Sequence, residues 1–322
     1  MKAIVYTKYG SPDLLQFKEV PIPTLRNNEV LVKVHAASAN AADLHLLRGT
    51  PFLFRLSAGL LRPKKQIIGA DIAGRVEAVG SNVTRLQAGD EIFGNVSGCG
   101  WGGFAEYVAV PEHVLVVKPA RLTFEQAAAV PMAAVTALQA LRDKGQIKSG
   151  QSVLINGASG GVGTFAVQIA KAYGAEVTAV CSTSKVGLMR SIGADHVIDY
   201  TREDFTRNGQ RYDLILAANG NRSISDYKRA LAPMGTYVMT GGSTAQMFQA
   251  MLLGPLHSKT GGKKMGNLLA KPNTRDLAFV KELLEAGKVV PVIDRCYPLS
   301  EAAEAIRYLE KGHASGKVVI SV

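Results

Sequence analysis

Residues 156–174 read NGASGGVGTFAVQIAKAYG, and this stretch decides the fold of the 322-residue chain. It continues the strand-like segment SVLI, opens with a cluster of glycines and goes on as an apolar helical pattern. Glycine in such a turn lets the backbone approach a phosphate, and the free N–H groups of the helix start favour an anion. Gly160, Gly161 and Val162 are therefore predicted to bind the pyrophosphate of a dinucleotide, with a merely structural turn as the alternative.

On both sides of this turn, strand-like and helix-like segments alternate from about residue 123 onward. The strand-like segments are apolar, and they lie at 152–158, 176–182, 195–200, 212–218 and 236–242, with a further candidate at 263–271. This alternation is typical of a parallel sheet covered by helices on both faces. Residues 123–272 are thus predicted to form a doubly wound Rossmann domain.

The end of the second strand in this region indicates which dinucleotide is bound. A fold specific for NAD has an acidic residue there for the ribose 2′-hydroxyl, whereas this sequence has Ser182. Ser182 and Lys185 together offer a hydroxyl and a cation, which suit the 2′-phosphate of NADPH. An ordinary helix-capping serine beside a surface lysine is the alternative.

The two ends of the chain show a different pattern of predicted secondary structure. Residues 1–122 contain short strand-like segments separated by Gly, Pro and Asn, with no dominant helical pattern, which predicts a partly open β-barrel. Residues 273–322 return to strand-like character, with helical patterns at 274–287 and 300–312. The expected fold class is α/β, with a barrel-like domain beside the Rossmann domain.

Composition and charge narrow the functional classes. The net charge is +11, but the basic residues are spread along the chain without an arginine-rich arm, so nucleic-acid binding is not expected. Three scattered cysteines and the lack of a signal peptide or membrane-span pattern favour a cytoplasmic protein. The basic residues Lys259, Lys263 and Lys264 follow AMLLGPL, so residues 247–264 could be a solvated loop, a substrate lid or a weak contact with an anionic membrane.

Several blocks of sequence, in order, resemble the medium-chain dehydrogenase/reductase superfamily. The blocks are ASANAADLHLLRG, IIGADIAGRVEAVG, AGDEIFG, GGFAEYV, VPMAAVTAL, NGASGGVGTFAVQIAK, IGADHVIDY and HASGKVVI. Within that superfamily the chain is similar to the zinc-independent quinone oxidoreductase and enoyl reductase branch. The resemblance implies a GroES-like catalytic domain made of residues 1–122 and 273–322, an inserted nucleotide-binding domain, and a homodimer.

The zinc-dependent relatives carry a catalytic cysteine, a Gly-His-Glu motif and a cysteine-rich lobe. Here Ala39-Asn40-Ala41 stands in place of the cysteine, and Gly69-Ala70-Asp71 stands in place of Gly-His-Glu. The six histidines occur singly along the chain, so no set of zinc ligands can be assembled from the sequence. No metal is expected.

The resemblance also assigns individual residues. It implies that Asn40 lies near the nicotinamide ribose and that Thr136 faces the nicotinamide, both as catalytic and cofactor-binding residues. His45 stands where many quinone reductases have a tyrosine, so it is a possible proton donor, with an idle histidine as the alternative. Further cofactor-binding residues implied by the resemblance are Tyr200, Asn219, Gly241, Gly242 and Lys317.

Without a metal to stabilise an alkoxide, reduction of an activated acceptor is the expected reaction. The chain is predicted to transfer a hydride from NADPH to quinones or to the C=C bond of α,β-unsaturated carbonyl compounds. The alternative is a non-catalytic NADPH-binding protein with a redox-sensing or structural, crystallin-like role.

Overall fold

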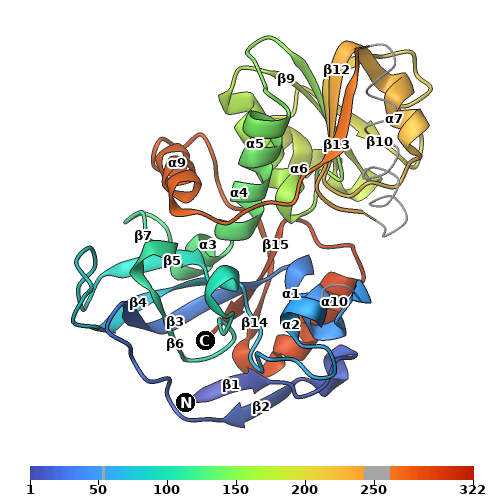
Figure 1. The fold of residues 1–322 in the computed structure, drawn as a ribbon. Coiled ribbons are helices and arrows are strands. Elements are labelled where there is room, and N and C mark those ends of the chain that lie inside the picture. Colours follow the sequence, from blue (N-terminus) through green and yellow to red (C-terminus); the bar gives the residue numbers. More distant parts are fainter. Residues whose placement is uncertain (53–54, 243–261) are drawn as a thin grey trace. The chain divides into compact units, whose positions relative to one another are not determined.

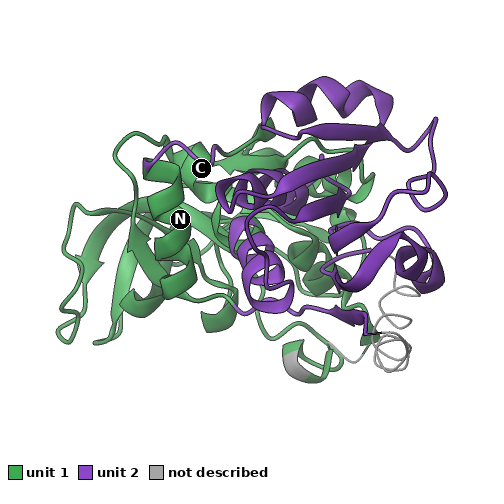
Figure 2. Ribbon diagram, turned by 90° about the horizontal axis from the view of Figure 1, so that it is seen from above, with its two compact units in different colours: residues 1–133, 272–285, 291–322 green, residues 134–271, 286–290 purple. Residues whose placement is uncertain are grey.

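The computed structural model describes residues 1–52, 55–242 and 262–322. The chain divides into two units (Figure 2), and each is built around its own sheet. Unit 1 comprises Met1–Ala133, Pro272–Glu285 and Pro291–Val322, and unit 2 comprises Ala134–Lys271 and Ala286–Val290. Both ends of the chain therefore contribute to unit 1.

Unit 2 contains a six-stranded parallel sheet in the order β10-β9-β8-β11-β12-β13. Figure 1 labels β9, β10, β12 and β13 of this sheet. The strands are β8 (Ser152–Asn156), β9 (Glu176–Cys181), β10 (His196–Asp199), β11 (Tyr212–Ala217), β12 (Leu231–Met239) and β13 (Lys264–Asn267). The strand order reverses direction between β8 and β11, which is the switch point where doubly wound sheets bind their ligands. The predicted Rossmann sheet is confirmed, including its sixth strand.

Helices connect these strands. They are α4 (Pro131–Leu138), which starts in unit 1 and continues as a π-helix over Gln139–Lys144, then α5 (Gly161–Ala172), the 3-10 turn η6 (Thr183–Lys185), α6 (Val186–Ser191) and α7 (Ile224–Ala230). Every residue of α5 from Gly163 to Ala170 is buried, because small and apolar side chains let this helix pack closely on the sheet. The start of α5 is thereby held directly after β8.

Unit 1 contains a seven-stranded sheet and a two-stranded sheet. The strands of the larger sheet are β3 (Glu29–Ala39), β4 (Asp71–Val79), β5 (Glu91–Asn95), β6 (Tyr107–Pro111), β7 (Leu115–Val117), β14 (Ile293–Pro298) and β15 (Lys317–Ser321). β1 (Lys2–Val5) and β2 (Gln16–Glu19) form the smaller sheet. β15 pairs antiparallel with β3, so the last strand of the chain is a central strand of unit 1.

The helical segments of unit 1 are shorter. They are η1 (Pro12–Leu14), α1 (Ala41–Arg48), α2 (Arg55–Ala58), η3 (Ser97–Cys99), η4 (Glu112–Val114), α3 (Phe124–Ala128), α9 (Thr274–Glu285), η7 (Leu299–Glu301) and α10 (Ala302–Glu310). The sequence indicated α9 and α10 but gave no sign of α1. Helix α1 has only eight residues between the capping residue Asn40 and Gly49, whose φ is 59°, so it is too short to show a clear period.

The segment considered for a lid or a membrane contact falls largely outside the described residues, Lys259 included. Of its other two lysines, Lys263 donates from Nζ to the Lys228 carbonyl at 2.7 Å, and Lys264 begins β13. None of the described helices combines the length and the apolar run that crossing a bilayer requires.

Candidate functional site

The glycines of the phosphate loop differ in whether the fold requires a glycine at their position. Gly157 has a φ of 77°, and a Cβ there would meet Asn219 at 2.7 Å. A Cβ on Gly163 would lie 2.2 Å from the Gly157 carbonyl oxygen, so both positions need glycine for the fold. Gly160 has an ordinary extended backbone, and a Cβ there would come no closer than 3.5 Å to any other group. The fold alone does not require glycine at position 160.

The start of helix α5 favours an anion. Gly160 caps the 12-residue helix α5 without a side chain, and the N–H groups of the first helical turn have no acceptor within the helix. These donors and the positive end of the helix dipole favour a phosphate. The predicted residues Gly160, Gly161 and Val162 all lie at this helix start. A dinucleotide pyrophosphate is therefore compatible with the loop.

Two polar residues that the sequence did not single out hold the neighbouring strand ends together. Asn156, the last residue of β8, donates from Nδ2 to the Tyr227 hydroxyl at 2.6 Å and to the Asn219 carbonyl at 3.4 Å. Burial raises the pKa of Tyr227, which stays a neutral phenol packed on Tyr237 with ring centroids 4.6 Å apart. Asn219 is exposed at the end of β11, as expected for a residue that faces a ligand.

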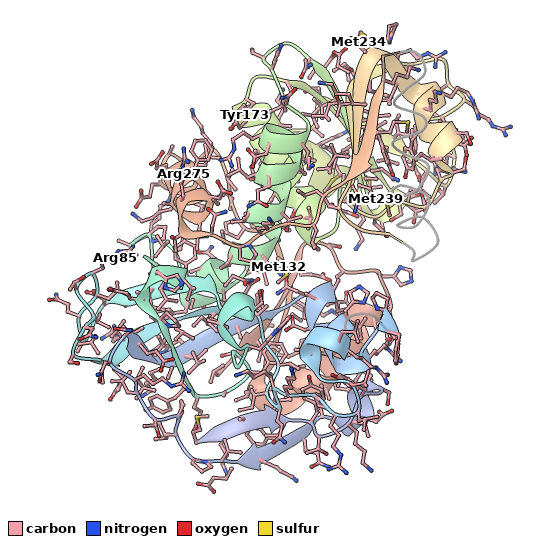
Figure 3. The ribbon with its side chains drawn as sticks, viewed as in Figure 1. Arg85, Met132, Tyr173, Met234, Met239 and Arg275 are labelled. Atoms are coloured by element: carbon pink, nitrogen blue, oxygen red, sulfur yellow. The ribbon has the colours of Figure 1, made fainter. Side chains whose placement is uncertain are left out.

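The end of β12 carries the predicted Gly241 and Gly242. Met239, labelled in Figure 3, is the last residue of this strand, and Gly242 forms a parallel bridge with Gly220 after β11. A Cβ on Gly241 would lie 2.5 Å from the Ala218 carbonyl oxygen. The backbones of the two strand ends thus lie close together at the ligand-binding edge of the sheet.

The residues predicted to bind a 2′-phosphate lie after β9 and β10. Ser182 precedes the turn η6, which contains Lys185, and Tyr200 donates its backbone N–H to the Cys181 carbonyl at 3.0 Å. Tyr200 as a whole is 46% exposed. Ser182, Lys185 and Tyr200 therefore occur on two adjacent strand ends.

In unit 1, Asn40 and Lys317 form one buried network. Lys317 Nζ donates to Asn40 Oδ1 and to the Ala39 carbonyl, and it lies 3.8 Å from Asp71 Oδ2. Asn40 Nδ2 in turn donates to the Ser38 carbonyl at 3.1 Å and to Asp71 Oδ2 at 3.0 Å. Both hydrogens of the Asn40 amide are thus bound within the protein.

Asp71 is the centre of this network. Its Oδ1 accepts from Asn95 Nδ2 at 2.7 Å and from the backbone N–H of Met132 at 3.1 Å, and Met132 is labelled in Figure 3. Burial raises the pKa of Asp71, while the Lys317 ammonium opposes this shift. Burial likewise lowers the pKa of Lys317, opposed by Asp71. The two groups stabilise each other as an ion pair.

Asp43 is a structural acid. Its two oxygens accept from the backbone N–H groups of Asn40 at 2.8 Å and Gly69 at 3.0 Å. The first hydrogen bond caps helix α1, and the second fixes the loop before β4. Burial raises the pKa of Asp43 to about 7. With both carboxylate oxygens bound to backbone N–H groups, Asp43 holds the local backbone in place.

The other two predicted catalytic residues lie on helices. His45 is on α1 in unit 1, with an exposed ring that makes no hydrogen bond to any residue that the structure describes. Thr136 is a half-buried residue of α4 in unit 2. Unit 1 therefore holds Asn40, His45 and Lys317, and unit 2 holds the remaining predicted residues.

Comparison with known proteins identifies the family. Residues 26–120 match the family model described as alcohol dehydrogenase GroES-like domain, and residues 192–320 match the one described as zinc-binding dehydrogenase. Over 99% of its length the chain is 36% identical to the chloroplastic NADPH-dependent alkenal/one oxidoreductase of Arabidopsis thaliana, of which it covers 79%. The chain belongs to the medium-chain dehydrogenase/reductase superfamily.

Solved structures of this superfamily agree with the fold. The quinone oxidoreductase from Coxiella burnetii is 32% identical with a TM-score of 0.88, and the match covers 100% of this chain and 99% of that one. A structure described as an NAD-dependent alcohol dehydrogenase is 30% identical with a TM-score of 0.87, and both chains are covered completely. The predicted GroES-like and Rossmann architecture is confirmed. Within the superfamily the chain belongs to the quinone oxidoreductase and enoyl reductase-like branch, and it is an oxidoreductase.

Zinc, which the name of one matching family model implies, does not fit the residues present. The two positions that stand in place of the catalytic cysteine and the Gly-His-Glu motif carry the amide of Asn40 and the carboxylate of Asp71, and the Lys317 ammonium lies 3.8 Å from that carboxylate. No group of three His, Cys, Asp or Glu side chains that could hold a metal exists among the residues that the structure describes. A lysine ammonium already supplies the positive charge at this position.

Proposed function

We propose that this enzyme is an NADPH-dependent reductase of quinones or of the C=C bond of α,β-unsaturated carbonyl compounds, and that it acts without zinc. Residues 1–122 and 273–322 would form the catalytic domain, and residues 123–272 would bind the cofactor. A homodimer in the cytoplasm completes the proposal. The homodimer and the cytoplasmic location rest on the sequence and the family resemblance.

The observation that carries the proposal is the buried network of Asn40, Asp71 and Lys317 in place of zinc ligands. Oxidation of an alcohol proceeds through an alkoxide, which a bound metal stabilises as a Lewis acid. An amide and a lysine that is committed to a carboxylate cannot replace that metal. A quinone or an enone accepts a hydride without prior formation of an alkoxide, so this group of residues favours reduction.

Some residues of this chain would bind the cofactor, and others would orient its nicotinamide. The bound nicotinamide cofactor supplies the hydride. The helix start at Gly160 binds its pyrophosphate, the exposed Asn219 and the backbone around Gly241 and Gly242 orient its nicotinamide end, and Ser182 with Lys185 binds the 2′-phosphate. His45, with its exposed ring, is the candidate that could deliver the proton to the reduced product.

The first test is the choice of substrate. With NADPH, the purified enzyme should reduce phenanthrenequinone or short enals at least about a hundredfold faster, by kcat/KM, than it oxidises ethanol or benzyl alcohol with NADP⁺, because no Lewis acid stabilises the alkoxide. Steady-state absorbance of NADPH measures both directions. Chelator treatment and metal analysis of the same preparation serve as controls.

Three outcomes would contradict the proposal. Fast alcohol oxidation without quinone or enone reduction would favour the activity named for the alcohol dehydrogenase relative. One zinc per chain together with loss of activity in chelator would overturn the metal-free site. Tight NADPH binding without turnover of any acceptor would favour the non-catalytic alternative.

The second test is the choice of cofactor. We expect Lys185→Ala to lower kcat/KM for NADPH by roughly tenfold to a hundredfold, because a charge-assisted bond to the 2′-phosphate is lost. NADH has no phosphate there and should respond little, so it is the internal control. Ser182→Asp should reduce the NADPH preference further, because its carboxylate repels the phosphate. An equal loss with both cofactors would mean that this site does not bind the 2′-phosphate.

A further inference from the structure

A second basic residue lies at the end of β10, next to the proposed 2′-phosphate site. Thr183, which follows Ser182, donates from Oγ1 to Asp199 Oδ2 at 2.5 Å. Arg202 Nε lies 3.6 Å from the same carboxylate oxygen. One oxygen of Asp199 therefore connects the Arg202 guanidinium to the residue that follows Ser182.

Asp199 is held firmly in this position. Besides Thr183, its other oxygen accepts from the backbone N–H of Thr201 at 3.0 Å and from Thr201 Oγ1 at 2.7 Å. The hydrogen bond from Thr183, followed by those from Thr201, lowers the pKa of Asp199, so it is ionised at neutral pH. A fixed negative charge beside the end of β9 would repel a 2′-phosphate unless a further cation compensates it.

Arg202 has the freedom to provide that compensation. Its side chain is 76% exposed and, among the residues that the structure describes, its ion pair with Asp199 is its single polar side-chain contact. A guanidinium has five N–H donors, so most of them remain available for an incoming anion. Because the planar guanidinium can bind two phosphate oxygens at once, Arg202 suits a phosphate better than a hydroxyl.

We propose that Arg202 is a second specificity-determining residue, which binds the 2′-phosphate of the cofactor together with Lys185. This inference rests on the proposed NADPH preference and extends it to a residue on a different strand end. The opposite role, in which Asp199 would accept a hydrogen bond from the ribose 2′-hydroxyl of NADH, is disfavoured because three donors from Thr183 and Thr201 already bind its oxygens.

The test compares two small probes in the full-length protein, adenosine 2′,5′-bisphosphate and ADP, by isothermal titration calorimetry. Arg202→Ala should weaken binding of the bisphosphate by about tenfold or more and change ADP binding by less than about twofold. The matched control is Arg207→Ala. The Arg207 side chain is 75% exposed, and it pairs at 3.9 Å with Asp204, three positions earlier, as Arg202 pairs with Asp199. Arg207→Ala therefore removes the same charge from the same unit.

The outcomes separate this inference from the proposed function. If Arg202→Ala and Arg207→Ala have equal effects, or if Arg202→Ala weakens both probes alike, Arg202 does not bind the 2′-phosphate. If wild type prefers the bisphosphate and only Lys185→Ala removes that preference, the NADPH proposal stands and the inference about Arg202 is wrong. If wild type binds ADP as tightly as the bisphosphate, the NADPH preference itself fails.

Discussion

Replacing Lys317 by methionine should lower the free energy of unfolding of unit 1 by about 3–5 kcal/mol, because the substitution leaves Asp71 as a buried charge without its cation. The Lys317 side chain is 3% exposed, so water cannot take over its role. The chain contains a single tryptophan, Trp101, and it lies in unit 1. Urea unfolding followed by tryptophan fluorescence therefore measures the change in this unit.

A matched control is Lys2→Met, also in unit 1. Lys2 pairs with Glu19 at 3.5 Å, and both side chains are exposed, so its loss should cost less than about 1 kcal/mol. Similar losses in the two variants would contradict the structural importance of the buried network. Adding Asp71→Asn to Lys317→Met should recover part of the stability, because the uncompensated carboxylate is then removed.

The loss caused by Lys317→Met should also depend on pH. Burial raises the pKa of both Asp71 and Asp43, the latter to about 7. An acid with a raised pKa contributes stability below its unfolded pKa, and this contribution is lost as the pH rises through the folded value. The variant should therefore differ less from wild type as the pH falls, because protonation of these carboxylates removes the negative charge that Lys317 no longer compensates.

Gly163→Val should destabilise unit 2 at least as much as Lys317→Met destabilises unit 1. A Cβ on Gly163 would lie 2.2 Å from the Gly157 carbonyl oxygen and 2.6 Å from that of Ala158, and both contacts are with backbone. Helix α5 would have to move away from β8, at a cost of about 3 kcal/mol or more. We expect a large drop in melting temperature or in soluble yield, together with loss of dinucleotide binding.

Two other glycines complete this experiment. Gly187→Ala in α6 places a Cβ where no atom lies within 4 Å, so it should be neutral or slightly stabilising. Gly160→Ala should leave the melting temperature nearly unchanged and weaken the dinucleotide, because the fold does not need glycine there. If Gly160→Ala lowers stability as much as Gly163→Val, the distinction between fold-determined and ligand-determined glycines is wrong.

The sequence predicted the parallel sheet of unit 2 almost completely, because its strands are apolar, short and separated by recognisable helices. It also placed Ser182, Lys185 and Tyr200 at strand ends, since the ends of parallel strands follow directly from the strand assignment. The helices α9 and α10 were likewise evident from their patterns. Local periodicity is a sufficient signal for elements of this kind.

The polar networks could not be predicted in the same way. Asn40 and Lys317 are 277 positions apart, and nothing in the local sequence of either shows that they form a hydrogen bond. Asp199 and Thr183 come together only because β9 and β10 are neighbours, and Asn156 meets Tyr227 across two strand ends. Such pairs depend on strand order and register, which propensity and spacing do not encode.

The pairing of β15 with β3 has a consequence for biosynthesis. At this junction the Lys317 side chain donates to the Ala39 carbonyl. The two residues are separated by 278 positions, and the whole of unit 2 lies between them in the sequence. At ordinary rates of translation the ribosome takes roughly 15–55 s to cover this distance. During that interval unit 2 can fold, while the edge of β3 that β15 will cover stays open. Until the final strand is made, this edge offers unpaired backbone groups to a neighbouring chain.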